Sequence, residues 1–282
     1  MITATLTDPT GVQLIGSWDH DGQHAGGDLL ISLDGWVAGV GAESERVART
    51  SGHGNFPAPT RRTGRTITMT VLLERDTRAE LWAEERALSG LFPDGGTGAL
   101  TVAQDDFELT TSVDLDGSPK ILTNLDGGFI TVEVPLQAPD PFLYAPARKT
   151  LLTPLGEGIG LRYPLFANGV LDYGAGVSTA DAVENLGNAE AFPSIWVYGN
   201  FPGGFQLTAG RRSVVWPWPT VLSAPVRVES SGSIWIGADN VTHLASVRQW
   251  FSIPPRGVIS PKLAPIQGGS GWGEVHQRDT YL

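Results

Sequence analysis

The stretch at residues 138–146, APDPFLYAP, constrains the fold of this 282-residue chain more than any other. Each of its three prolines fixes a backbone φ angle and removes an amide donor, so neither a long helix nor a central strand can run through it. Phe142, Leu143 and Tyr144 supply an apolar anchor that a flexible linker would lack. We interpret the stretch as a stiff, docked joint between two halves of nearly equal length. A proline-rich surface loop inside one domain is the alternative.

The composition favours a mainly β protein with two domains. A length of 282 residues suits two domains that each bury a core. The chain has 36 glycines and 20 prolines, yet 41% of its residues are hydrophobic, which is typical of short strands joined by many turns. No window approaches about 18 consecutive apolar residues, so we expect no membrane span. The first residues lack the pattern of a secretory signal.

In the first half, apolar and polar residues alternate along several short segments, as they do in half-buried strands. The clearest is residues 66–73, TITMTVLL, and 29–33, 99–103, 107–115 and 129–136 behave similarly. The apolar residues between positions 40 and 64 have no regular spacing. A loop of that length is uncommon inside a compact domain and is usually functional or disordered.

Residues 77–92 predict the one convincing helix of the chain. Thr77 and Glu80 form the pattern of a capping box, in which each side chain accepts from a backbone N–H of the other residue. Leu81 and Leu88 fall on one stripe, which is typical of a helix face that packs on a sheet. The Pro-Asp-Gly-Gly sequence from Pro93 ends the helix.

This order of elements resembles a known family. Two strands, a long loop, a G-R-x-I-x-M-x-V-L-L strand, a helix, three strands and P-D-P-x-x-Y cover residues 28–144. The order is similar to the N-terminal half of the distal tail (Dit) proteins of long-tailed, non-contractile phages. The resemblance implies that residues 1–144 form a β-sandwich-like, ring-forming domain with one helix.

The second half is almost entirely strand-like. Residues 185–193, NLGNAEAFP, match the N-x-G-N-A-x-x-x-P segment of the same family. Asn185, Gly187 and Asn188 suit a tight turn that accepts left-handed conformations. Short strands separated by turns predict a sandwich or jelly roll. The resemblance implies a galectin-like β-sandwich over residues 145–265, followed by a glycine-rich, flexible tail at 266–282.

Known catalytic patterns are missing from the sequence. The chain has no cysteine, and none of its three lysines follows a glycine, so thiolate chemistry and a phosphate-binding P-loop are excluded. His20 and His24 lie near Asp19 and Asp21, where a metal site is an alternative to a hydrated loop. A glycosidase needs only two opposed carboxylates, which 30 acidic residues leave open. We expect no enzyme, no metal and no cofactor.

Three tryptophans of the second half have two interpretations. Exposed aromatic side chains on a sandwich can stack on sugar rings, which makes Trp216, Trp218 and Trp235 candidate contacts for a glycan or a partner protein. A large sandwich also needs tryptophan in its core. The sequence leaves both readings open.

The charge is unevenly distributed. Residues 1–146 carry 9 Lys and Arg against 21 Asp and Glu, a net charge of −12, while residues 147–282 have a net charge of +1. An acidic protein repels nucleic acid, because binding requires many cations that neutralise phosphates. Acidic walls would let DNA pass along a channel without adhering. A solvated acidic surface that only aids solubility is the alternative.

The family resemblance implies a structural role at a phage tail tip. A distal tail protein is made in the host cytoplasm, assembles with itself into a ring of six, and resides in the virion. It contacts the tail tube protein, the tail-tip hub or tail-associated protein, and in some phages a receptor-binding protein, while DNA passes through without specific nucleic-acid binding. The alternative function is a carbohydrate-binding module that recognises host glycans. The candidate ring-interface residues are Arg61, Arg62, Arg65, Leu81 and Trp82.

Overall fold

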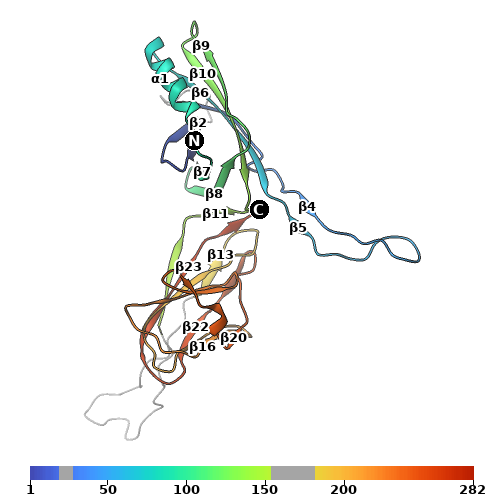
Figure 1. Cartoon of the computed structure of the whole chain (residues 1–282), viewed down its shortest axis with the longest axis vertical. Helices are drawn as coiled ribbons and strands as arrows, with labels where there is room; N and C mark the ends of the chain where they lie inside the picture. Colours follow the sequence, from blue (N-terminus) through green and yellow to red (C-terminus); the bar gives the residue numbers. More distant parts are fainter. Residues whose placement is uncertain (19–27, 154–181) are drawn as a thin grey trace. The chain divides into compact units, whose positions relative to one another are not determined.

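The computed structural model describes residues 1–18, 28–153 and 182–282 and is mainly β (Figure 1). The chain divides into two compact units, Met1–Pro146 together with Leu282, and Ala147–Tyr281. The proline-rich stretch at 138–146 ends at this division.

Outside residues 19–27, the first unit contains one helix and a series of strands connected mainly by short turns. The elements are β1 (Ile2–Thr7), β2 (Gln13–Trp18), β3 (Leu29–Asp34), β4 (Ala42–Glu43), β5 (Arg61–Arg62), β6 (Arg65–Glu74), α1 (Arg78–Ser89), β7 (Thr97–Gln104), β8 (Phe107–Leu115), β9 (Lys120–Asn124), β10 (Phe129–Ala138) and β11 (Leu143–Tyr144).

One large sheet organises the first unit. Its strands follow the order β11-β8-β7-β1-β2-β3-β6-β10-β9, and β10 also pairs with β8 through Leu136↔Leu115. The sheet therefore curls until two distant strands meet, and its inner face encloses the core. Alternation explains which residues line that face, because successive side chains of a strand point to opposite sides. On β6 the buried residues are Arg65, Ile67, Met69, Val71 and Leu73.

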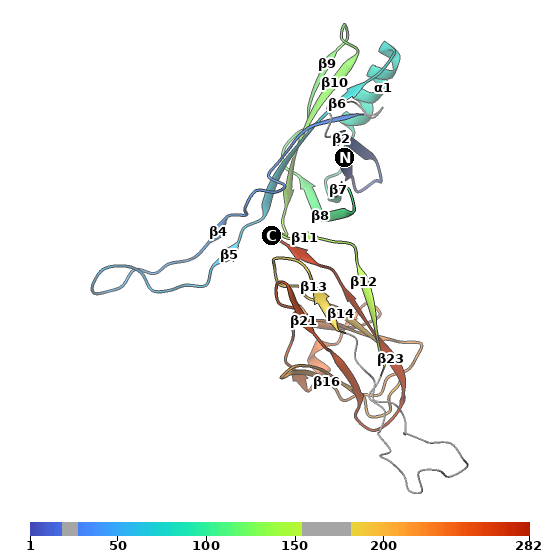
Figure 2. The same ribbon diagram turned by 180° about the vertical axis from the view of Figure 1, so that it is seen from behind.

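The local sequence explains where helix α1 begins and where it ends. Thr77 is its N-cap, and the predicted capping box with Glu80 is present in both directions. The helix ends at Ser89, three residues before the predicted end, because Gly90 caps it and Phe92 takes a left-handed φ of 53°. The helix contacts β9 and β10 (Figure 2).

The proline-rich stretch is docked onto the first unit by hydrogen bonds. Asp140 accepts from the Phe142 backbone N–H at 3.1 Å and from the Tyr144 hydroxyl at 2.6 Å. The Thr111 hydroxyl donates to the Phe142 carbonyl at 3.1 Å, and the Leu143 side chain is buried. The stretch is therefore an ordered segment of the first unit, as its apolar anchor predicted.

In its described residues, 147–153 and 182–281, the second unit is built from short strands and one short 3-10 helix. The elements are β12 (Arg148–Leu152), β13 (Val183–Asn185), β14 (Ser194–Asn200), β15 (Phe205–Ala209), β16 (Arg212–Trp216), β17 (Val226–Glu229), β18 (Ser233–Ile236), β19 (Asp239–Asn240), η2 (Thr242–Leu244), β20 (Val247–Arg248), β21 (Gly257–Ile259), β22 (Lys262–Pro265), β23 (Ser270–Gln277) and β24 (Thr280–Tyr281).

Two sheets of the second unit share one core. One sheet has the order β12-β23-β14-β17-β18-β19 and the other β20-β16-β15-β22. Buried residues of the first sheet, such as Val197 and Val275, belong to the same apolar cluster as Phe205, Leu207 and Trp216 of the second. The second unit is therefore a β-sandwich, and the fold class predicted from the turn-punctuated strands is confirmed.

The predicted flexible tail at 266–282 is wrong. Residues 270–277 form β23, which lies between β12 and β14 and buries Val275. Gly271 allows a close backbone approach: a Cβ there would lie 2.1 Å from the Tyr198 carbonyl oxygen. Only glycine lets the two strands come this close, so a glycine-rich sequence here indicates tight pairing and not mobility.

The N-x-G-N segment also differs from the predicted tight turn with left-handed conformations. Gly187 has no left-handed φ; a Cβ there would lie 1.9 Å from the Thr280 carbonyl oxygen. The Asn185 side chain is fully buried, and its Oδ1 accepts from the backbone N–H of Gly187 at 3.0 Å and of Thr280 at 3.2 Å. Its Nδ2 donates to the Ala189 carbonyl at 2.7 Å. The motif therefore ties two distant segments of the second unit together.

Candidate functional site

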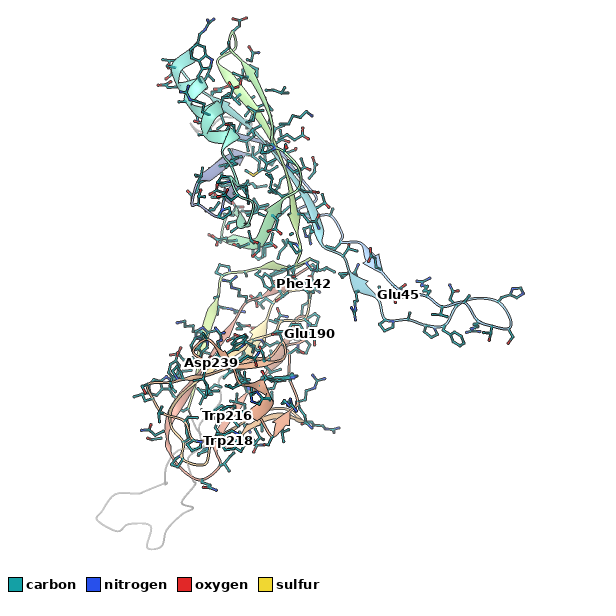
Figure 3. The ribbon with its side chains drawn as sticks, in the orientation of Figure 1. Glu45, Phe142, Glu190, Trp216, Trp218 and Asp239 are labelled. Atoms are coloured by element: carbon teal, nitrogen blue, oxygen red, sulfur yellow. The ribbon has the colours of Figure 1, made fainter. Side chains whose placement is uncertain are left out.

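The segment at residues 40–64, which we call the arm, is a thin two-stranded hairpin (Figures 1 and 2). Its strands pair at the base through Ala42↔Arg62 and Glu43↔Arg61. Further out, the backbone N–H of Phe56 donates to the Val47 carbonyl at 2.9 Å. The Arg49 guanidinium lies over the Phe56 ring, 5.9 Å from its centroid. Figure 3 shows Glu45 on this arm.

The arm has almost no core of its own. All its residues from 41 to 62 are exposed except Ser44 and Ala58, which are half-buried. Isolated two-stranded hairpins are marginally stable in water because they bury too little apolar surface. The exposed Val47 and Phe56 side chains therefore supply apolar contact area that a second molecule could cover.

The arginines predicted at the ring interface separate into two groups. Arg61 and Arg62 are exposed on the arm, and Arg62 Nη1 donates to the Val40 carbonyl at 3.0 Å. Arg65 is only 3% exposed, so its assignment to an interface is wrong. It lies on the inner face of β6, where its side chain binds backbone carbonyls of the first unit, and this burial lowers its pKa.

The two helix residues predicted at the interface also separate. Leu81 is 1% exposed and faces the sheet, so it cannot contact a second molecule, and its interface assignment is wrong. Trp82, the next residue, is 51% exposed. The adjacent strand β9 carries the exposed Leu122. Leu122 lies on the opposite face of β9 from Thr123, whose hydroxyl donates to Glu85 of the helix at 3.0 Å, so the helix itself presents Trp82 as an exposed apolar side chain.

A second apolar surface of the first unit was not predicted from the sequence. An open pocket of about 420 Å³ is lined by side chains of β1, β3, β7 and β8. Val37, at its rim, is 92% exposed, and Ile31 is also exposed. Exposed apolar patches on a soluble protein commonly mark interaction sites. The lining includes Ile2, Ile31, Leu33, Val37 and Val102.

The three candidate tryptophans of the second unit occupy different environments. Trp216 is 2% exposed and belongs to the core, so the prediction that it contacts a glycan or partner is wrong. Trp218 is 50% exposed, and its Nε1 donates to the Leu244 carbonyl at 2.9 Å (Figure 3). Trp235 is half-buried, and its Nε1 donates to the Ser233 hydroxyl at 2.9 Å.

Part of the acidic charge of the first unit is already paired. Arg75 Nη1 lies 2.6 Å from Asp28 Oδ1, and Arg75 Nη2 lies 2.9 Å from Glu84 Oε2. The hydrogen bond that Arg75 donates to Asp28 is the main reason that the pKa of Arg75 is raised. Asp34, Glu74, Asp106 and Glu108 remain exposed.

The described residues hold no cluster of three or more His, Asp or Glu side chains that could bind a metal ion. The candidate metal site at His20 and His24 lies outside the described residues. Within the described part of the chain, no helix combines the length and the hydropathy of a membrane-spanning segment.

No family model matches the sequence, and no curated protein matches it. Among solved structures, the crystal structure of the Dit protein of SPP1 is similar, with a TM-score of 0.64 and 13% sequence identity over 100% of each chain. That protein is described as a paradigm of the hub adsorption apparatus in phages that infect Gram-positive bacteria. The chain has the Dit fold.

A baseplate structure of phage P2 in its activated conformation with Ca is also similar, with a TM-score of 0.48 and 11% identity over 98% of this chain and 97% of that one. The likeness to SPP1 Dit confirms, as a likeness of fold, the resemblance to distal tail proteins that the sequence indicated. The likeness to SPP1 Dit spans both units of the Dit fold and the segment that joins them.

Sequence reasoning missed a row of aromatic residues on the second unit. Trp196, Tyr198 and Trp272 lie together on β14 and β23. The alternation of residues 195–199 already separated Trp196 and Tyr198 from the buried Ile195 and Val197. Trp272 could not be added from sequence, because it lies in the segment that was interpreted as a flexible tail.

Proposed function

We propose that this chain is a structural protein of a phage tail tip that assembles into a closed ring. The ring would join the tail tube protein to the tail-tip hub or tail-associated protein and to the host-adhesion apparatus, including a receptor-binding protein where one is present. The observation that carries the proposal is the likeness of the whole chain to SPP1 Dit, over 100% of each chain. Six subunits is the number that the family resemblance implies.

The arm supports assembly by physical argument. Residues 42–62 carry four arginines and two glutamates, within a half of the chain whose net charge is −12. A basic, exposed hairpin is attracted to the acidic surface of a second copy. Docking would also cover Val47 and Phe56, which the arm leaves exposed. In the proposed ring, each arm therefore lies on the next subunit.

Head-to-tail contacts are the geometry that closes a ring, because they join two different surfaces of the same chain. The first unit offers more than one such surface: the arm, the Trp82 face of α1, and the open apolar pocket beside Val37. We propose that these surfaces are buried between neighbouring subunits.

The acidic charge would then have a role inside the ring. Exposed carboxylates such as Asp34, Glu74 and Asp106 would repel DNA phosphates near the wall of the bore. This repulsion is screened beyond about 8 Å at physiological salt, so it would prevent adhesion without impeding passage. Asp28 contributes little to it, because Arg75 neutralises that carboxylate.

Immunogold electron microscopy of phage particles tests the proposed location. Antibodies against the full chain should label the end of the tail that is distal to the capsid. Antibodies that have been pre-absorbed with the purified chain should leave the same particles unlabelled. Label on the capsid, or the absence of the chain from purified particles by mass spectrometry, would contradict a role at the tail tip.

A further inference from the structure

The outer surface of the six-stranded sheet carries a cluster of aromatic and charged side chains, which we call the aromatic face. Tyr198 and Trp272 have ring centroids 5.4 Å apart with planes inclined by 17°, and Trp196 and Tyr198 have centroids 6.3 Å apart with planes inclined by 14°. The rings are thus nearly parallel across two strands. The residues of the aromatic face are Trp196, Tyr198, Arg227, Glu229, Trp235, Trp272, Glu274 and His276.

Strand register explains why these residues share one face. Glu274 pairs with Trp196, Trp196 with Arg227, and Arg227 with Trp235, which makes one row across four strands. Their neighbours along each strand are buried in the core. Directly opposite residues on one face of a sheet lie within contact distance. The row therefore alternates between charged and aromatic side chains on the side away from the core.

The charged groups of the aromatic face are held in place. The Arg227 guanidinium lies 5.4 Å from the Trp196 centroid and 5.6 Å from the Trp235 centroid, a position that favours a cation between two ring faces. Arg227 Nε forms an ion pair with Glu229 Oε1 at 3.1 Å. The Ser194 hydroxyl donates to the same Glu229 oxygen at 3.3 Å.

At the β23 end of the row, contacts also fix the side chains of Glu274 and His276. His276 Nε2 and Glu274 Oε2 are 3.1 Å apart, and the His276 ring lies 6.0 Å from the Trp196 ring. Burial, with a smaller contribution from Glu274, raises the pKa of the Tyr198 hydroxyl, so this group remains a hydrogen-bond donor at neutral pH. Side chains fixed in this way lose little conformational entropy when a ligand binds.

We propose that the aromatic face binds a neutral, pyranose-based oligosaccharide. A pyranose ring has an apolar face of C–H groups, which fits an aromatic ring, and a rim of hydroxyls, which need nearby donors and acceptors. The aromatic face supplies ring surfaces at Trp196, Tyr198 and Trp272. It supplies hydrogen-bond acceptors at the carboxylates of Glu229 and Glu274. This binding is separate from the proposed role in ring assembly.

The charges favour a sugar over a protein partner. The buried centres of protein–protein interfaces are depleted of glutamate, because a carboxylate covered by apolar surface loses its water without a partner. Here Glu274 pairs directly with Trp196, and Glu229 lies on the same face of β17 as Arg227, with which it forms an ion pair. Carboxylates next to aromatic rings fit a ligand that brings its own hydroxyl donors.

Binding of the full chain to an array of neutral oligosaccharides of glucose, galactose, mannose and N-acetylglucosamine tests the proposal. The affinity for the strongest ligand is then measured by calorimetry. Trp272→Ala and Glu274→Gln should each weaken binding by at least about tenfold, since stacking and charged hydrogen bonds each contribute at that scale. Trp272→Phe should weaken it by less than about threefold, because the ring is kept.

Two controls separate binding from folding. Trp218→Ala removes an exposed tryptophan outside the aromatic face and should leave the affinity unchanged. Glu274→Gln keeps the side-chain volume and carries the test if Trp272→Ala fails to fold. An array without signal for the wild-type chain overturns the proposal, as does a glycan affinity that survives both substitutions. A photo-crosslinker at Tyr198 that captures a tail protein, with no glycan bound, would assign the face to that protein instead.

Discussion

Arg65 Nη1 donates to the backbone carbonyl of Trp36 at 2.6 Å, inside the first unit. The same nitrogen donates to the carbonyls of Gly35 at 3.0 Å and Ala38 at 2.9 Å, which lie at the root of the arm. Arg65 Nη2 donates to the Pro141 carbonyl at 3.2 Å, in the proline-rich stretch. One buried guanidinium therefore fixes the root of the arm and the joint to the same strand.

Replacing Arg65 by methionine should destabilise the first unit by about 3 kcal/mol. Methionine fills much of the volume but leaves four carbonyl groups without this donor, one of them buried and three partly buried, and each fully buried unsatisfied group costs about 1–3 kcal/mol before relaxation. Urea unfolding of the full chain measures the loss. Arg61→Met, at an exposed position on the arm, is the matched control and should cost under about 0.5 kcal/mol. Equal losses for the two variants would contradict the role given to Arg65.

Asp8 should make stability depend on pH at the acidic end. Its Oδ1 accepts from the Thr10 hydroxyl at 2.7 Å and from the Val12 N–H at 2.9 Å, and its Oδ2 accepts from the Phe92 N–H at 3.2 Å. Burial alone would raise the pKa of this carboxyl, but these bonds and one from the Thr10 N–H outweigh it, and the net effect is a pKa below 3.8.

Because the pKa of Asp8 is lower in the folded state, the charged carboxylate stabilises the fold above pH 3.8, and this stabilisation is lost as the pH falls through the folded-state value. Asp8→Asn should therefore be less stable than wild type at pH 7, by about 1–2 kcal/mol. The difference should shrink below about pH 4. Urea unfolding at several pH values checks this, and a difference that stays constant down to pH 3 would contradict it.

Truncation of Trp216 should cost much more stability than truncation of Trp218. Trp216→Ala removes a core side chain that is 2% exposed and should cost about 3–5 kcal/mol. Trp218→Ala should cost about 1 kcal/mol, the value of its bond to the Leu244 carbonyl. Trp216→Phe should be milder than Trp216→Ala, because the buried Nε1 of Trp216 has no hydrogen-bond partner among the described residues. Thermal and urea unfolding of the three variants provide the comparison.

Arg61→Glu should weaken assembly without destabilising the subunit. Arg61 is exposed, so the melting temperature should stay within about 1 °C of wild type. If the arm docks on an acidic neighbour, the reversed charge should reduce the association constant by at least about tenfold. Sedimentation velocity over a range of concentrations measures it. Arg211→Glu, an exposed change in the second unit, should leave association unchanged; an equal effect at both positions would show that only net charge matters.

Local features were predictable from the sequence, and contacts between distant segments were not. The Thr77–Glu80 capping box and the alternation along β6 depend on residues three or two apart, so their patterns are visible in one sequence. The partners of Arg65 lie up to 76 residues away, and nothing local separates a buried arginine from the exposed pair before it. Leu81 is a different case, because its stripe with Leu88 already indicated a face that packs on the sheet, and its assignment to an interface disregarded that pattern.

The largest error in the prediction from sequence concerned the role of glycine. In residues 266–282 it was interpreted as flexibility, whereas Gly271 permits β23 to approach β14 more closely than any larger residue allows. A glycine can provide backbone flexibility or permit two strands to approach closely. Which of the two applies depends on the residue opposite it in the fold, and a single sequence does not show that residue. This error also hid Trp272 from the candidate site.

Electron microscopy of the purified full-length chain tests the central claim, that this protein is the subunit of a tail-tip ring. The chain should be imaged alone and mixed with the tail tube and tail-tip hub proteins of the same phage. We predict closed rings of fixed subunit number with a central bore, in which each arm lies on the adjacent subunit. Monomers under every condition, or open filaments in place of rings, would contradict the claim.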